Sequence, residues 1–247
     1  MSDTNAAKAA APSPAAESPK SVQRWAWEWL KSIAVALVIW MVLRTLLIEA
    51  FRIPSSSMER TLLVGDFLFV NKALYGAEVP LVHAHLPAFR QPRRGDIVVF
   101  DSRTQEGVKV VKRLIGMPGD TLEMKQGALS RNGLVQQEPY VQRLDSLSDT
   151  IDAEMRWQLP YLLPRVDRNR YQPSRDNWGP LVVPRDSFFV MGDNRDNSYD
   201  SRYWGFVPRN VIRGRPLFVY YSFENEPWRV VPFLTAIRWG RIGTMPR

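Results

Sequence analysis

An apolar segment near the N-terminus most constrains what this chain can fold into. Over residues 30–48 only four side chains are polar, namely Lys31, Ser32, Arg44 and Thr45. A helix of that length is about 28 Å long, close to the thickness of the hydrocarbon core of a bilayer. Three tryptophans precede the segment, as in an interfacial aromatic belt: Trp25, Trp27 and Trp29. The segment therefore predicts one transmembrane helix, which we assign to residues 24–50.

Two other interpretations of the segment exist. A cleaved signal peptide would end in a small-residue site, and Leu46–Phe51 is a poor one. A buried core helix stays possible because the unbroken apolar run, Ile33–Leu43, is short. Basic residues on the two sides are nearly balanced, so charge does not determine the orientation. Residues 1–23 are rich in Ala, Pro and Ser, which predicts a disordered tail.

After residue 50 the hydrophobic pattern changes from helical to strand-like. Short runs rich in Val, Ile, Phe and Tyr are separated by Gly-, Pro- and Asp-containing turns. The runs are Asp66–Lys72, Asp96–Asp101, Val108–Ile115, Ser187–Met191 and Leu217–Phe223. Because no helix–strand alternation indicates a parallel sheet, we expect a mainly β fold, an antiparallel β-barrel or sandwich. Residues 51–129 and 185–247 would form this main domain, and the polar, Pro-rich residues 130–184 an inserted smaller β subdomain.

Composition limits the available chemistry. The chain has no cysteine and two histidines, which excludes thiol nucleophiles and thiolate metal sites and leaves little room for a His-based site. The net charge is +8, but the basic residues are scattered and no nucleic-acid-binding motif frames them. We therefore expect no nucleic-acid partner. Hydroxyl, amine, carboxylate and guanidinium groups remain for an enzyme, and we expect no cofactor and no metal.

Four short stretches carry groups suited to chemistry. They are PSSSM at 54–58, RGDIVVF at 94–100, VKRLIGMPGD at 111–120 and GDNRDNSYDSRYWGFVP at 192–208. Taken singly, each also has a purely structural interpretation, such as a capped turn for the serines. Lys112 is unusual for a solvated lysine, since it shares a strand face with Val110 and Leu114. The last stretch lacks the ligand spacing of a calcium loop, and its arginines favour an ion-paired loop.

In this order the four stretches resemble the motifs of the type I signal peptidases, membrane-bound serine proteases that remove signal peptides from exported proteins. The resemblance runs from about residue 44 to residue 216. It implies a Ser–Lys dyad, with Ser57 as the nucleophile and Lys112 as the general base. A lysine can act as a base only if burial and nearby positive charge lower its pKa towards neutrality. Arg113 and the apolar neighbours of Lys112 make the position suitable.

The resemblance implies further roles by position. Ser55 corresponds to an oxyanion-hole donor and Ser198 to the residue that orients the lysine amine. Two ion pairs are implied as scaffolding: Arg113 with Asp193, and Asp200 with Arg202. The implied substrate-binding positions are Phe51, Ile53, Met58, Leu62, Val110 and Val111. Val110 departs from the aromatic residue often found in the family. The implied specificity is for small side chains, as in Ala-x-Ala sites.

The resemblance also implies a location and partners. These are the bacterial inner (cytoplasmic) membrane, one span with a cytoplasmic N-terminus, and a catalytic domain on the outer (periplasmic) face. Preprotein signal peptides, the lipid bilayer and a place beside the protein-export translocon are the implied partners. Ser57 follows Ile48 by nine residues, so an extended linker between them reaches at most about 30 Å. The nucleophile is therefore expected close to the membrane.

Two alternative functions remain open. One is a dedicated maturation peptidase of pilus or conjugation systems, which belongs to the same enzyme class. The other is a membrane-tethered β domain that binds peptides without cleaving them.

Overall fold

The computed structural model describes residues 22–42, 44, 47–76, 78–79, 84–144, 149–224 and 231–247. It divides into two compact units, Met1–Met41 and Val42–Arg247. Most of the predicted tail, residues 1–21, lies outside the described residues.

The first unit contains one long helix, α1 (Val22–Val42). Within it, Arg24–Val42 is long and apolar enough to cross a membrane, with a mean hydropathy of 1.4. The apolar side chains of α1 are exposed, including Leu37, Ile39 and Trp40. Exposure of this kind fits a membrane span better than the core helix considered above.

The helix and the predicted anchor, residues 24–50, differ in their bounds. The helix begins at Val22, inside the segment assigned to the tail, and it ends at Val42. Residues 48–50, assigned to the anchor, instead begin strand β1 (Ile48–Arg52). They pair antiparallel with a strand about twenty residues later, starting at Ile48 opposite Asn71. An apolar run by itself does not reveal this long-range pairing, because short apolar runs suit helix and strand alike.

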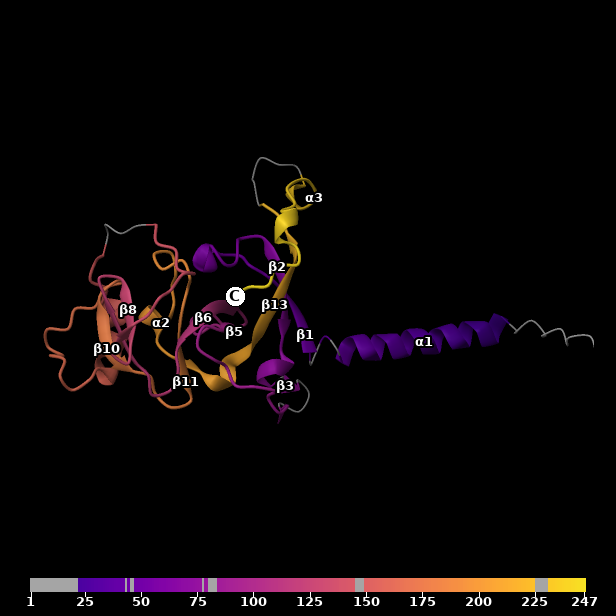
Figure 1. Cartoon of the computed structure of the whole chain (residues 1–247). Helices are drawn as coiled ribbons and strands as arrows, with labels where there is room; N and C mark the ends of the chain where they lie inside the picture. Colours follow the sequence, from indigo (N-terminus) through magenta and orange to yellow (C-terminus); the bar gives the residue numbers. More distant parts are fainter. Residues whose placement is uncertain are drawn as a thin grey trace, which may run out of the picture. The chain divides into compact units, whose positions relative to one another are not determined.

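The second unit, hereafter the body, is mainly antiparallel β, as predicted (Figure 1). Its largest sheet has seven strands in the order β1-β2-β13-β5-β6-β11-β12. The other strands of that sheet are β2 (Asp66–Asn71), β5 (Ile97–Asp101), β6 (Lys109–Gly116), β11 (Ser187–Met191), β12 (Val207–Pro208) and β13 (Ile212–Ser222). Four short helices lie between strands: η2 (Ser56–Met58), η3 (Ala73–Tyr75), α2 (Ser201–Trp204) and η5 (Arg209–Val211). Two more, α3 (Pro232–Thr235) and η6 (Trp239–Arg241), follow β13. A two-stranded sheet is formed by β3 (Glu78–Val79) and β4 (Ala84–His85).

A second, four-stranded sheet contains part of the predicted inserted subdomain together with residues just before it, and we keep the name subdomain for this sheet and the segments up to β10. Its order is β10-β7-β8-β9, and in Figure 1 it lies at the end of the body away from β1. Its members are β7 (Thr121–Lys125), β8 (Ala128–Arg131), β9 (Leu134–Val135) and β10 (Trp178–Val182), and η4 (Ala153–Tyr161) packs beside it. The sheet begins at Thr121, nine residues before the predicted start of the subdomain at residue 130. The MPGD turn before β7 ends β6 and starts the subdomain.

Two apolar cores position the functional groups. One contains Ile53, Met58 and Leu62 together with residues of β2, β5 and β13. The other joins the two sheets, because Leu122 and Trp178 of the small sheet pack with Phe189 of β11. The subdomain therefore shares its core with the strand that leads into the 192–208 motif.

The strand β13 starts five residues before the predicted Leu217. Pro216 removes a ladder donor, but a register shift between Pro216 and Phe218 accommodates it. Gly214 lies so close to β2 that a Cβ there would be 2.4 Å from the carbonyl oxygen of Asn71. Pro216 and Gly214 both disfavour a strand when only the sequence is considered. The irregular pairing with β2 accommodates Pro216, and the close approach of β2 requires the glycine.

Candidate active site

The serine motif forms a tight turn at the end of β1. The ladder continues through Ile53, whose N–H donates to the carbonyl of Asp66 over 2.8 Å, and Pro54 then interrupts it because it has no N–H. The chain turns into η2, which carries Ser57. Met58 is 1% exposed and packs into the core behind the turn. Because Met58 is held in the core, the neighbouring Ser57 is held at the edge of that core.

Strand β6 brings Lys112 to the serine. Lys112 lies opposite Val98 of β5, and its side chain is buried. Its Nζ is 2.5 Å from the Oγ of Ser57, within hydrogen-bond distance. The structure therefore brings together the two residues nominated as nucleophile and base.

Burial changes the protonation of the lysine. Loss of solvent lowers the pKa of the Lys112 ammonium from 10.5 to about 8, because the charged form is the one that needs water. Asp200 and Asp193 oppose this shift and Arg202 favours it. A lysine with this pKa is a neutral amine in a useful fraction of molecules near neutral pH, and a neutral amine can accept a proton.

Two buried ion pairs surround the dyad. Arg113 holds Asp193 with two hydrogen bonds, Nε to Oδ1 at 2.7 Å and a terminal nitrogen to Oδ2 at 2.6 Å. Arg202 holds Asp200 in the same way, with both bonds at 2.9 Å. Although burial opposes ionisation of Asp200, the charge of Arg202 and the surrounding hydrogen bonds keep its pKa below the usual range. Paired in this way, the Asp200 carboxylate stays charged inside the protein.

Ser55 and Ser198, the other two serines nominated for the site, have different contacts. The Oγ of Ser55 is 3.4 Å from the Oγ of Ser57. The hydroxyl of Ser198 donates to Asp200 at 2.8 Å. Among the charged groups near Lys112, Asp200 has the largest effect on the pKa of the lysine. Ser198 thus contacts the network that sets the charge of the lysine.

A cavity of about 260 Å³ opens beside Ser57. Its lining includes five of the six predicted substrate-binding residues: Phe51, Ile53, Met58, Val110 and Val111. The sixth, Leu62, is fully buried in the core behind the turn and is not part of that lining. Most of the lining is apolar, which suits small apolar side chains.

Unpaired strand edges flank the cavity. β1 is the first strand of its sheet. β6 pairs with β11 only from Arg113 onward, so Lys109–Lys112 are paired on the β5 side alone among the described strands. Four antiparallel pairings connect β1 to β6, which makes the two edges parallel to each other. An extended peptide could add to such edges by backbone hydrogen bonds.

Sequence reasoning missed several residues of the site. Asn194 donates from its N–H to the carbonyl of Ser57 at 3.1 Å and from its side chain to that of Ser56 at 3.2 Å. Thr61 donates to Asp193 at 2.5 Å. Gly192 has no room for a side chain, since a Cβ would lie 2.2 Å from the Oγ of Ser198. Asn194 and Gly192 lie in a motif that the sequence analysis singled out, but nothing in the sequence marks their contacts.

Metal binding has no support in the described part of the chain. No group of three or more His, Asp or Glu side chains there is arranged to hold a metal ion.

Comparisons with known proteins agree with these features. Residues 26–221 match a family model described as "Signal peptidase, peptidase S26". The chain is 36% identical to signal peptidase I of Pseudomonas aeruginosa, over 85% of this chain and 78% of that protein. It is 34% identical to signal peptidase I of Leptolyngbya laminosa, over 98% and 94% of the two chains. With signal peptidase I of Bacillus amyloliquefaciens it shares 35% identity, over 84% and 93%.

Proposed function

Since this chain belongs to the signal peptidase, peptidase S26, family, we propose that it cleaves preproteins at a membrane by a Ser57–Lys112 mechanism. The chain is a serine endopeptidase of the signal peptidase I class, and it acts on the signal peptides of preproteins. The mechanism, the cleavage site and the membrane side form the proposal. The observation that carries it is the buried Lys112 amine 2.5 Å from the Ser57 hydroxyl.

In the first half of the reaction, Ser57 Oγ attacks the scissile carbonyl carbon while neutral Lys112 takes the hydroxyl proton. Collapse of the tetrahedral intermediate breaks the C–N bond. The leaving amine takes that proton from the Lys112 ammonium, and an ester to Ser57 remains. Water then attacks the ester while Lys112 takes one of its protons; the C–O bond to Ser57 breaks, and the serine oxygen takes that proton back from the Lys112 ammonium. The Ser55 hydroxyl and the backbone N–H of Ser57 would stabilise the oxyanion, and one such donor is typically worth about 3 kcal/mol.

The cavity supports an Ala-x-Ala type of cleavage site. Phe51, Val110 and Val111 line the cavity next to Ser57, and such an apolar lining suits small apolar side chains on the residue before the cut. A substrate strand along the β6 edge would present alternate side chains to this cavity, because successive side chains of a strand point to opposite faces. This explains a requirement for small residues at two positions separated by one.

Membrane attachment is supported by two features. The α1 helix provides an apolar span, and the C-terminal segment of the body exposes large apolar side chains such as Leu234, Trp239 and Met245. Exposed apolar groups of this kind suit a lipid surface. We propose a single-span protein with a cytoplasmic N-terminus and its body on the outer face of the bacterial inner membrane. Signal peptides become available there, beside the export translocon.

The test is cleavage of a purified preprotein in detergent, with sequencing of the new N-terminus. We expect one cut after Ala-x-Ala, which Ser57→Ala and Lys112→Met abolish. Lys125→Met is the control, because the Lys125 side chain is 74% exposed and far from the dyad in the small sheet. Cleavage retained by either dyad variant refutes the mechanism. A wild type that cuts only one dedicated pilin-type substrate supports the maturation peptidase instead.

A further inference from the structure

The loop of residues 192–200, which we call the catalytic loop, contacts the backbone at the nucleophile. Asn194 binds the carbonyls of Ser57 and Ser56. Asn197 donates from its side chain to the hydroxyl of Ser56 at 2.7 Å. The loop also carries Ser198 next to Asp200. A displacement of this loop would therefore move the nucleophile and the groups that face Lys112.

The other side of the catalytic loop is held by residues 138–144, which we call the bracing segment. Gln142 donates to the carbonyl of Asp193 at 2.8 Å and accepts from the N–H of Arg195 at 3.0 Å, as in a short parallel bridge. The N–H of Leu144 donates to the carboxylate of Asp196 at 2.5 Å. The bracing segment belongs to the inserted subdomain, to which the sequence analysis assigned no role.

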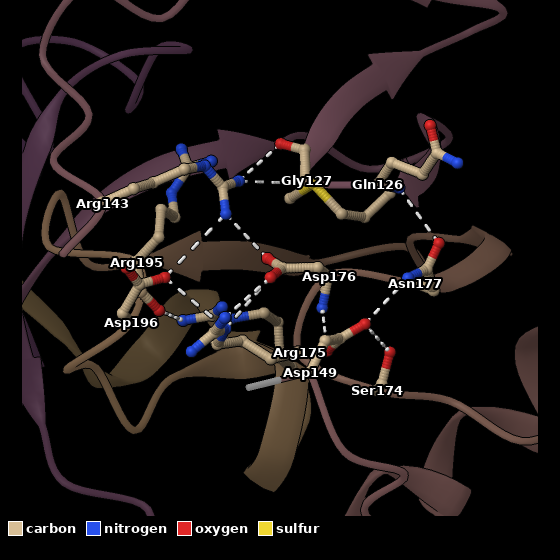
Figure 2. Close-up of polar contacts among 12 residues, drawn as sticks. Gln126, Gly127, Arg143, Asp149, Ser174, Arg175, Asp176, Asn177, Arg195 and Asp196 are labelled. Carbon is tan, nitrogen blue, oxygen red and sulfur yellow. Dashed lines mark hydrogen bonds and ion pairs between the residues drawn. The ribbon is translucent and has the colours of Figure 1, made fainter. Parts of the chain in front are cut away.

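Four charged side chains connect the subdomain to the catalytic loop (Figure 2). They are Arg143 of the bracing segment, Arg175 and Asp176 just before β10, and Asp196 of the catalytic loop. Arg143 pairs with Asp176 at 2.7 Å and donates to the carbonyl of Gly127 at 2.5 Å. Arg175 pairs with Asp176 at 2.8 Å. Asp196 of the catalytic loop lies 3.5 Å from Arg175 and 3.9 Å from Arg143. Each carboxylate thus faces both guanidinium groups.

Three of the four side chains of the cluster are shielded from solvent, whereas Arg143 is 29% exposed. The exposed fractions of the Asp196, Asp176 and Arg175 side chains are 5%, 11% and 11%. Ion pairs at such depth are screened much less than surface pairs, and removing one charge leaves its partners poorly compensated. Although burial opposes ionisation of Asp176, hydrogen bonds from Arg175 and Arg143 keep its pKa below the usual range.

We propose that the cluster of Arg143, Arg175, Asp176 and Asp196 is a positioning device that holds the catalytic loop in register with Ser57. This inference rests on the proposed function. The subdomain then supplies no group to the reaction. It holds Asp196, and Asp196 holds the loop that orients the dyad.

The test is Asp196→Asn. Asparagine keeps the size of the side chain and its carbonyl oxygen can still accept the Leu144 N–H, but the charge that faces both arginines is lost. We expect kcat to fall about tenfold, since displacements of up to 1 Å at the reacting groups have effects of that order or larger. We expect little change in KM, because Asp196 and its charged partners Arg143 and Arg175 are not among the residues that line the cavity.

The pH profile separates positioning from a direct charge effect. The charged groups that act on Lys112 are Asp200, Arg202 and Asp193, and desolvation outweighs them. Removal of a distant carboxylate would by itself lower the pKa of Lys112. A displaced loop instead admits water to Lys112, which weakens the desolvation and raises the pKa of Lys112. We therefore expect the acidic limb of kcat/KM to move up by about half a pH unit in Asp196→Asn.

Three further variants complete the experiment: Glu123→Gln, Arg143→Gln alone, and Arg143→Gln combined with Asp196→Asn. Glu123→Gln is the matched control, because it breaks the pair with the exposed Lys125 in the same subdomain and should leave kcat and the pH profile unchanged. Arg143→Gln combined with Asp196→Asn restores the charge balance, so the loss in the double variant should be smaller than the product of the single losses.

The outcomes distinguish this inference from the proposed function. If wild type does not cut the preprotein, the proposed function fails. If wild type cuts but Asp196→Asn has the wild-type kcat and pH profile, the inference is overturned, whatever happens to the thermal midpoint. A downward shift of the acidic limb also overturns it, because the effect would then be one of direct charge.

Discussion

Substitution of Gly192 by alanine tests how tightly the catalytic loop is packed against the nucleophile. A Cβ at this position would lie 2.2 Å from the Oγ of Ser198 and 2.4 Å from the carbonyl oxygen of Ser57. Nonbonded contacts normally begin at about 3.5 Å, so one or both neighbours must move by about 1 Å. The backbone of Gly192 does not have a positive φ, so the effect is steric and not a matter of backbone strain.

The size of the effect follows from what must move. Ser57 and Ser198 are both buried, and overpacking of a buried site typically costs about 1–3 kcal/mol. That corresponds to a fall of about 3–10 °C in the thermal midpoint of a body of this size. A shift of about 1 Å at the nucleophile is expected to lower kcat/KM about a hundredfold. Activity should therefore fall much more than stability.

The assay is preprotein cleavage at saturating and limiting substrate, together with thermal unfolding. Gly240→Ala is the control, because a Cβ there meets no atom within 4 Å and the residue has no positive φ. If Gly192→Ala keeps kcat/KM within about twofold of wild type and the same midpoint, the loop is not packed as described. The steric argument would then be wrong.

Three further predictions concern the buried charges. Because burial lowers the pKa of Lys112 to about 8, the acidic limb of kcat/KM should rise through about pH 8, and a flat profile between about pH 6 and pH 9 contradicts this. Between about pH 8 and pH 10.5 the unfolded chain holds a proton on Lys112 that the folded chain has lost, so the unfolding free energy should rise with pH. The rise should be up to about 3 kcal/mol relative to Lys112→Met, measured by urea titration; equal slopes for the two proteins would refute it. Arg113→Met leaves the buried Asp193 carboxylate without its bidentate partner, so the unfolding free energy should fall by about 3–5 kcal/mol. Loss of the exposed Lys125–Glu123 pair in Lys125→Met should change it by less than about 1 kcal/mol, and a similar loss in both variants would contradict the role of burial.

The strands of the body were predictable where their signal is local. The runs at Asp66, Asp96, Val108 and Ser187 coincide with β2, β5, β6 and β11 to within one residue at either end. Alternating β-branched and aromatic residues between turns produce that signal without reference to the rest of the chain. The strand β1 was missed because its apolar residues continue the pattern of the preceding helix, and only its pairing with β2 distinguishes it.

The functional residues also differ in whether a local sequence pattern identifies them. The order of four motifs was enough to nominate Ser57 and Lys112, although 54 residues of chain separate them. The bracing segment carries no recognisable pattern, and Gln142 acts through its backbone, which any residue shares. Asp196 was visible as one acid among several in a polar loop, but the sequence does not show which arginines it faces.

The sequence by itself determined an apolar N-terminal span, a β-rich body and the residue types available for the reaction. These depend on composition and on periodicity along the chain. The tertiary structure decided that Lys112 is buried against Ser57, that Gly192 has no room for a side chain, and that the inserted subdomain reaches the catalytic loop through Asp196. Burial, close approach and charge pairing depend on residues distant in sequence, and they exist only when folding brings those residues together.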